Sequence, residues 1–143
     1  MSTDQIELWH KRARPTPTAS DFNVQLGCHF EELDEMMRAV ETSDDELWND
    51  VRLQVLSLSR LLKANIMKAS ISNRKELLDS LADQVVTGIG VGHCAGMKTA
   101  EGIAAVNRSN YSKFDKNGYP IFNEQGKVMK GPDYAPPNLE GLY

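Results

Sequence analysis

Acidic residues gather in two short stretches of the chain, one near residue 31 and one near residue 76. Within each stretch the carboxylates are three or four residues apart, so a helix would project them from one face. Like charges this close repel one another unless a cation lies between them. Sets of carboxylate oxygens are the ligands that Mg²⁺ and Mn²⁺ prefer. The pattern therefore predicts a divalent-metal site with the ligands Glu32, Glu35, Glu76, Asp79 and Asp83.

The alternative interpretation of each stretch is an acidic helix face in contact with water. Two features favour the metal site. The helical stripe from Glu76 to Gly90 contains no Lys or Arg, whereas solvated faces normally mix both signs of charge. The second stretch also lies in a segment that is otherwise rich in leucine and valine, which belongs in a protein interior.

A second group of residues has the chemistry of an anion site. Three of them recur every third residue at the end of a predicted helix, and two lysines follow in a predicted hairpin. Lysine and asparagine bind phosphate oxygens and base or ribose edges. The alternative is a polar helix end followed by an exposed hairpin. We take the predicted substrate-binding residues to be Asn107, Asn110, Lys113, Lys127 and Lys130.

Five helices are expected to position these groups. Apolar periodicity, capping residues and the breaks at Pro15 and Pro17 place their limits. Ser20 or Asp21 is the expected N-cap of the second helix, and Asp34 is expected to pair outward with Arg38. The expected core stripe of this helix consists of Phe22, Leu26, Phe30, Leu33, Met37 and Val40. The predicted helices span residues 3–13, 20–40, 43–69, 73–95 and 98–113, and residues 119–130 are expected to form a small β-hairpin before an extended tail.

The length of 143 residues fits one domain, with a core over about 20–113 and the hairpin and tail over 114–143. The net charge of −4 argues against nucleic-acid binding. Two distant cysteines and the absence of a signal-like or membrane-spanning segment lead us to expect a soluble cytoplasmic protein, in a bacterium or in the host cell if the gene is from a phage. The third helix is apolar on more than one side, which suggests a partner subunit.

The acidic stretches resemble the signature EExxE…ExxD of the all-α nucleoside triphosphate pyrophosphohydrolases, the MazG-like superfamily. Glu31-Glu32-Leu33-Asp34-Glu35 matches the first part and Glu76-Leu77-Leu78-Asp79 matches the second. In an alternative register Asp83 takes the place of the motif aspartate, and Ser80 falls where the family has glutamate. Residues 106–139, with the segments SN-x-SK and GK-x-x-KGP, look like those of phage-type members, among them the MazZ group that acts on guanine deoxynucleotides.

The resemblance implies a MazG-like helical bundle that forms dimers or tetramers and hydrolyses a nucleoside triphosphate to the monophosphate and pyrophosphate. Mg²⁺ or Mn²⁺ would be held by the carboxylates, Glu31 or Glu35 would be the catalytic base, and Lys113 would offset phosphate charge. The base stays open: dGTP or GTP is one candidate, and a dUTPase-like or phosphoribosyl-ATP substrate is another. The non-enzymatic alternative is a helical bundle that uses its acidic face for interaction.

Overall fold

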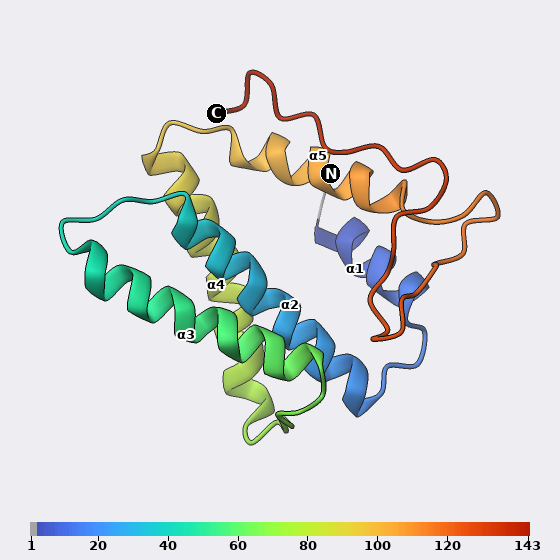
Figure 1. Ribbon diagram of the computed structural model, residues 1–143. Helices are drawn as coiled ribbons and strands as arrows, with labels where there is room; N and C mark the ends of the chain where they lie inside the picture. The colour runs from blue at the N-terminus through green and yellow to red at the C-terminus, as the bar shows by residue number, and fades with distance from the viewer. Residues whose placement is uncertain (1–2) are drawn as a thin grey trace. The chain divides into compact units, whose positions relative to one another are not determined.

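The computed structural model describes residues 3–143 and contains five α-helices in that part of the chain (Figure 1). The predicted all-α class is confirmed. Four of the helices lie within about two residues of their predicted limits, and none of the five is both long and apolar enough to cross a membrane. The helices are α1 (Thr3–Ala13), α2 (Ala19–Arg38), α3 (Asp45–Lys63), α4 (Arg74–Cys94) and α5 (Thr99–Tyr111).

The helices belong to two compact units. The α2–α3 unit consists of Pro17–Ser70 and the short segment Asn123–Lys127. The α5 unit contains α1, α4 and α5, built from the residues through Thr16, Ile71–Phe122 and Val128–Tyr143. The single domain expected from the chain length stays a prediction.

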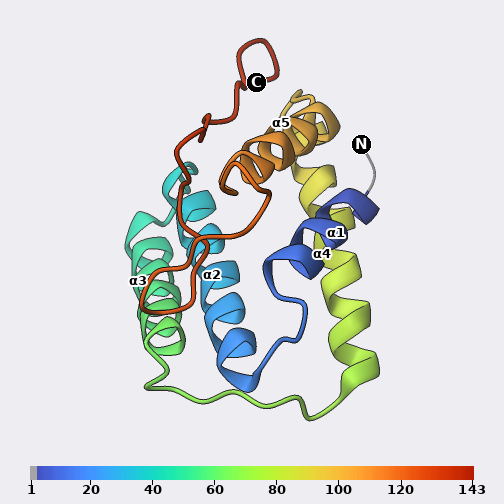
Figure 2. The same cartoon turned by 90° about the vertical axis from the view of Figure 1, so that its right-hand side faces the viewer.

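Helices α2 and α3 form an antiparallel pair joined by a short loop, and they lie side by side in both views (Figures 1 and 2). A capping box starts α2: the Thr18 hydroxyl accepts from the Asp21 amide, and the Asp21 carboxylate accepts from the Thr18 amide at 2.8 Å. The N-cap is therefore Thr18 and not Ser20 or Asp21 as predicted. Asp44 caps α3 by accepting from the Leu47 amide at 3.0 Å.

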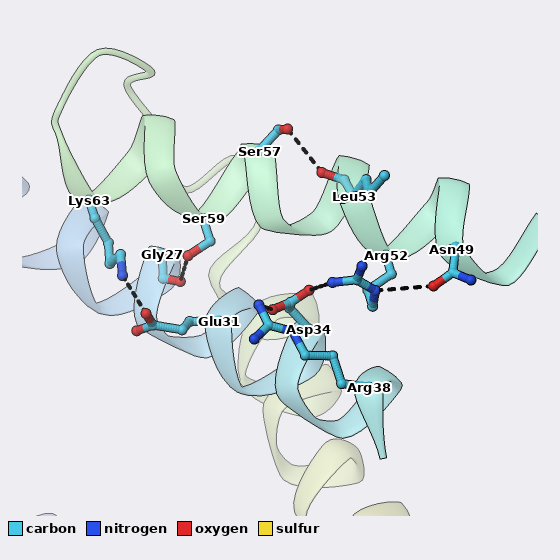
Figure 3. Close-up of polar contacts among 10 residues, drawn as sticks. All are labelled: Gly27, Glu31, Asp34, Arg38, Asn49, Arg52, Leu53, Ser57, Ser59 and Lys63. Carbon is cyan, nitrogen blue, oxygen red and sulfur yellow. Dashed lines mark hydrogen bonds and ion pairs between the residues drawn. The ribbon is translucent and has the colours of Figure 1, made fainter. Parts of the chain in front are cut away.

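The seam between α2 and α3 is narrow and partly polar. Gly27 lets the helices approach closely, and the buried Ser59 hydroxyl donates to the Gly27 carbonyl at 2.8 Å (Figure 3). Asn23 and Asp34 are also buried in this unit, whereas Leu33 and Val40 are exposed. The expected core stripe of the second helix is therefore confirmed at Met37, which is buried, and wrong at Leu33 and Val40.

Helix α3 ends at Lys63, earlier than predicted, because the following residues are held in another conformation. Asn65 has a positive φ of 56°, which an α-helix cannot continue. The buried Asn23 side chain donates to the Met67 carbonyl at 2.9 Å and accepts from the Ala69 amide at 2.9 Å. One asparagine of α2 thus satisfies backbone groups of the segment that leaves α3.

The core of the α5 unit joins both ends of the chain. Trp9 stacks on Phe114 with ring centroids 5.5 Å apart, and Ala13 and Val128 complete the buried cluster. The Trp9 indole donates to the Asn110 carbonyl at 2.9 Å. Helix α1 is thereby fixed against the end of α5.

The predicted C-terminal hairpin is absent from the described residues, which contain a single antiparallel bridge between Phe122 and Val128. On one side of the bridge the chain reverses through a turn, in which the Gly126 amide donates to the Asn123 carbonyl at 3.0 Å. On the other side Gly131 turns in against the carbonyls of Lys113 and Phe114. The chain then runs without regular structure past α5, where the Ser109 hydroxyl donates to the Ala135 carbonyl at 2.8 Å.

Candidate functional site

The first acidic stretch lies in the C-terminal half of α2, and the surroundings of its Asp34 indicate a structural role. Asp34 is fully buried and forms ion pairs with Arg38 of α2 and with Arg52 of α3, the latter at 2.9 Å (Figure 3). The expected pairing of Asp34 with Arg38 is confirmed, but the expected outward orientation is wrong, because Asp34 is buried and Arg52 provides a second cation from the neighbouring helix. A buried carboxylate requires such partners. The ion pairs fix how α2 is rotated against α3.

That rotation leaves Glu32 and Glu35 exposed on α2. The two residues are one helical turn apart, so their carboxylates leave the same side of the helix. Their oxygen donors suit Mg²⁺ and Mn²⁺. Both therefore remain predicted metal ligands, and Glu35 also remains a predicted base.

Glu31 is held by two lysines. Lys63 of α3 contacts one carboxylate oxygen at 2.7 Å and Lys127 contacts the other at 3.2 Å. Burial alone would raise the pKa of the Glu31 carboxyl, but the two lysines outweigh it and the pKa lies below its ordinary value. Burial alone would lower the pKa of Lys127, but the charge of Glu31, assisted by those of Cys28 and Glu32, raises it. Glu31 is thus a fixed anion between two fixed cations.

The second acidic stretch lies on α4 in the α5 unit. Glu76, Asp79 and Asp83 are all exposed, in keeping with their common stripe. Asn73 caps the helix by accepting from the Glu76 amide at 3.1 Å. Of the whole of α4, only Gly92 is buried.

The two acidic stretches are described separately because they belong to different units. Within residues 3–143, no three His, Cys, Asp or Glu side chains gather into a group that could hold a metal ion. The donor types fit a hard divalent cation, and α2 and α4 supply two and three of the predicted ligands respectively. The metal site stays a prediction.

The predicted substrate-binding residues have different surroundings. Lys127 reaches Glu31, as described above. Lys113 donates to the Asn110 side chain at 2.7 Å, so these two act together at the end of α5. Asn107 is buried, and Lys130 lies over the ring of Tyr134 at 4.7 Å from its centroid. The structure thus brings Lys113 to Asn110 and Lys127 to the first acidic stretch.

Two residues of this site were missed by the sequence interpretation, Arg52 and Lys63. Both lie on α3 and face α2, where each binds one carboxylate of the first acidic stretch. An antiparallel register between the two helices would have placed them opposite those carboxylates. The apolar periodicity of the third helix does not by itself show that register.

Comparisons with known proteins do not assign a family to this site. No family model matches the chain, and neither the curated proteins nor the solved structures give a match.

Proposed function

We propose that the protein is a nucleoside triphosphate pyrophosphohydrolase, which cleaves a nucleoside triphosphate and water into the monophosphate and pyrophosphate. The resemblance of Glu31–Glu35 and Glu76–Asp79 to the MazG-like signature suggests this reaction. The observation that carries the proposal is the meeting of Lys63 and Lys127 at Glu31, beside exposed motif carboxylates. The α2–α3 unit thus offers cations that can bind phosphate and carboxylates that can bind a metal, the groups that phosphoryl transfer requires.

The resemblance implies that Mg²⁺ or Mn²⁺, which when bound polarises phosphate oxygens and acidifies water, would be held by Glu32, Glu35, Glu76, Asp79 and Asp83. Lys127 is the cation best suited to exchange partners, because its side chain is 48% exposed against 18% for Lys63. It would leave Glu31 for a phosphate oxygen, while Lys63 stays on Glu31. Lys113, oriented by Asn110, would contribute a further charge-assisted contact.

Glu35 is the better candidate for the base that takes a proton from the attacking water. A base must be able to accept a proton near the operating pH. The lowered pKa of Glu31 makes its carboxylate a weaker base, and both of its oxygens already accept from lysines. We therefore assign Glu31 to positioning the lysines and Glu35 to proton transfer.

The finer features of the proposal come from the resemblance. They are a MazG-like bundle, a dimer or tetramer, a cytoplasmic location and a substrate among the common nucleotides. dGTP or GTP is the first candidate, followed by dUTP-like and phosphoribosyl-ATP-like substrates. Exposed apolar residues on α3 and α4, such as Leu47 and Leu78, support the assembly of several subunits.

The direct test is to screen the common NTPs and dNTPs for pyrophosphate release with Mg²⁺ and with Mn²⁺. We expect release with at least one of them, and at least a hundredfold loss in Glu32→Gln and Asp79→Asn, which remove a ligand charge but keep the side-chain size. Glu46→Gln and Glu101→Gln are matched controls, since both residues are exposed on helices outside the motifs. No release with any nucleotide, or equal rates in all four variants, would favour the acidic interaction protein instead.

A further inference from the structure

A hollow of about 600 Å³ opens within the α5 unit, between the end of α1 and the loop that follows α5. Its volume falls in the range of about 300–1,000 Å³ that is usual for small-molecule sites. The side chains that give it chemical character are Arg12, Asn117, Tyr119 and Phe122. None of them belongs to the proposed hydrolytic site.

The loop that forms one wall is fixed by its own hydrogen bonds. The Asp115 carboxylate accepts from the Asn117 amide at 2.8 Å and from the Tyr119 amide at 2.9 Å, and the Asp115 amide donates to the Tyr119 carbonyl at 2.8 Å. Gly118 supplies the positive φ of 79° that the turn needs. Ala13 at the end of α1 lines the hollow and also packs in the buried cluster with Phe114. The hydrogen bonds of the turn and the packing of Ala13 therefore hold two walls of the hollow in place.

Two aromatic rings at this hollow are not used to fill the core. Tyr119 is 67% exposed and Phe122 is 45% exposed, in a chain with only four phenylalanines and four tyrosines. Exposed aromatic rings beside a cavity offer faces on which a planar ligand can stack. The guanidinium of Arg14 already lies over the Phe122 ring, 5.6 Å from its centroid. The Tyr119 ring is left as the more accessible stacking surface.

The charge at the hollow is positive although the whole chain is acidic. Arg12 lines it, and a Cβ added at Gly118 would lie 3.9 Å from the Arg12 guanidinium, so this cation reaches across to the loop. Arg14 flanks the same wall. The one carboxylate of the turn, Asp115, accepts two backbone amides, which partly neutralise it. An anionic group is therefore favoured beside Arg12.

We propose that this hollow binds a nucleoside phosphate, with the base stacked on Tyr119 and the phosphate held by Arg12. A planar ring joined to a phosphate matches an aromatic face beside a guanidinium, which binds phosphate oxygens in pairs. A long nucleic acid needs many more cations than the two arginines here, in a chain with a net charge of −4. The site is separate from the motif carboxylates and needs no metal.

The test is calorimetric titration of the full chain with GMP and with AMP, in the presence of EDTA. We expect either monophosphate to bind more tightly than guanosine, adenosine or inorganic phosphate. Tyr119→Ala should weaken binding by about five- to 150-fold, the range for loss of one base stack. Arg12→Ala should weaken it by about ten- to 150-fold. Tyr119→Phe should keep wild-type affinity because the ring is retained.

Lys11→Ala is the matched control, because Lys11 lies next to Arg12 on α1 but pairs with Glu7 at 2.7 Å and does not line the hollow. It should bind as the wild type does, and circular dichroism should show all variants folded. Failure of both monophosphates to bind at millimolar concentration would overturn the proposal. Equal affinity in Arg12→Ala and Lys11→Ala would also overturn it, as would an oligonucleotide binding far more tightly than the monophosphates.

The same titration separates this site from the hydrolytic one. Glu32→Gln should lose hydrolysis and keep monophosphate binding in EDTA, while Tyr119→Ala should lose that binding. If Glu32→Gln abolishes both, the nucleotide is bound at the motif carboxylates and the second site is wrong. If hydrolysis is absent from the wild type but the binding pattern holds, the second site stands without the enzyme.

Discussion

Asp34 and Glu35 are neighbours in sequence and have opposite surroundings. Asp34 is buried between two arginines, whereas Glu35 lies exposed on the other side of α2. One residue of the acidic stretch therefore stabilises the helix pair while the next is available for chemistry. The spacing within a helix explains the difference, since consecutive residues point about 100° apart.

We expect Asp34→Ala to destabilise the protein by about 3–5 kcal/mol, because it leaves Arg52 without its buried partner. Urea unfolding of the variant measures this loss. Glu35→Ala is the control from the same turn, and its effect should stay within about 0.5 kcal/mol because the residue is exposed. Equal effects of the two substitutions would contradict the structural role of Asp34.

The lowered pKa of Glu31 predicts a dependence of stability on pH. A carboxyl with a depressed folded-state pKa stabilises the protein above its unfolded pKa and loses this contribution as the pH falls through the folded value. The stability difference between wild type and Glu31→Gln should therefore be constant near neutral pH. It should shrink as the pH falls below the ordinary value of 4.5. Denaturant titrations from neutral to acidic pH measure it.

The exposed Glu46→Gln serves as the control for that experiment. Removing either lysine from Glu31 should reduce the same pH dependence, because each one lowers the pKa. A Glu31→Gln difference that stays unchanged throughout the acidic range would show that the two ion pairs do not form in solution.

The two candidate bases can be separated by kinetics once a substrate is found. Glu35→Gln should lower kcat by about 10²–10⁴-fold, the usual contribution of a general base. Glu31→Gln should act mainly on KM, because it releases Lys63 and Lys127 rather than removing the base. Steady-state kinetics on both variants decides the assignment. A larger loss of kcat in Glu31→Gln would reverse it.

At the scale of the elements, local signals placed the helices and non-local contacts changed their ends. Asp44 and Asn73 could be recognised as caps because their partners lie three residues away. The end of α3 could not, because it depends on Asn23, more than forty residues earlier in the chain. The prediction of the hairpin was wrong for a similar reason, because Gly131 packs closely against the backbone of Lys113 and Phe114.

The candidate site likewise has some features that local spacing predicts and others that depend on residues far apart in the sequence. The placement of Glu32 and Glu35 one turn apart on one side of a helix follows from their spacing, and the pairing of Asn110 with Lys113 also spans one turn. The contact of Lys127 with Glu31 spans 96 positions, and no local pattern could show it. The burial of Asp34 required knowledge of Arg52 on another helix.

The close approach of α2 and α3 predicts that Gly27→Ala will be destabilising. A Cβ there would lie 2.8 Å from the Ser59 carbonyl oxygen, which belongs to the backbone and cannot move freely. We expect a loss of about 1–3 kcal/mol from overpacking. Gly88→Ala on α4 is the control: its Cβ meets nothing within 4 Å, so higher helix propensity should stabilise it slightly. Thermal and urea unfolding of both variants would show whether the two substitutions change the stability of the protein in opposite directions.

At the scale of the whole molecule, the exposed apolar residues of α4 support the proposed assembly of several subunits. Leu78, Val85 and Ile89 lie on one face of the helix, at spacings of seven and four residues, and are 71%, 49% and 40% exposed. Soluble monomers rarely leave such residues together in water. We therefore expect at least a dimer, with an interface above roughly 1,000 Å².

Light scattering at micromolar concentration tests this assembly. The wild type should have a mass at least twice the 16.0 kDa of one chain, and Leu78→Glu should shift it toward the monomer. Leu8→Glu on α1 is the control. Leu8 is also a largely exposed leucine, at 54% against 71% for Leu78, but it lies on a different helix. A wild-type mass of one chain would contradict the prediction, and so would equal dissociation by both substitutions.

The division of the chain between its units also sets an order in which the protein can form as it is synthesised. Residues 17–70 pair α2 with α3 through contacts that are close in sequence, so this helix pair can fold soon after it leaves the ribosome. The α5 unit has to wait, because Trp9 needs Asn110 and Tyr111 needs the Gln5 carbonyl, 101 and 106 positions away. Lys127 is synthesised later still. Glu31 can therefore pair with Lys63 first, and the second cation of the candidate site joins only after residues 64–126 have also been synthesised.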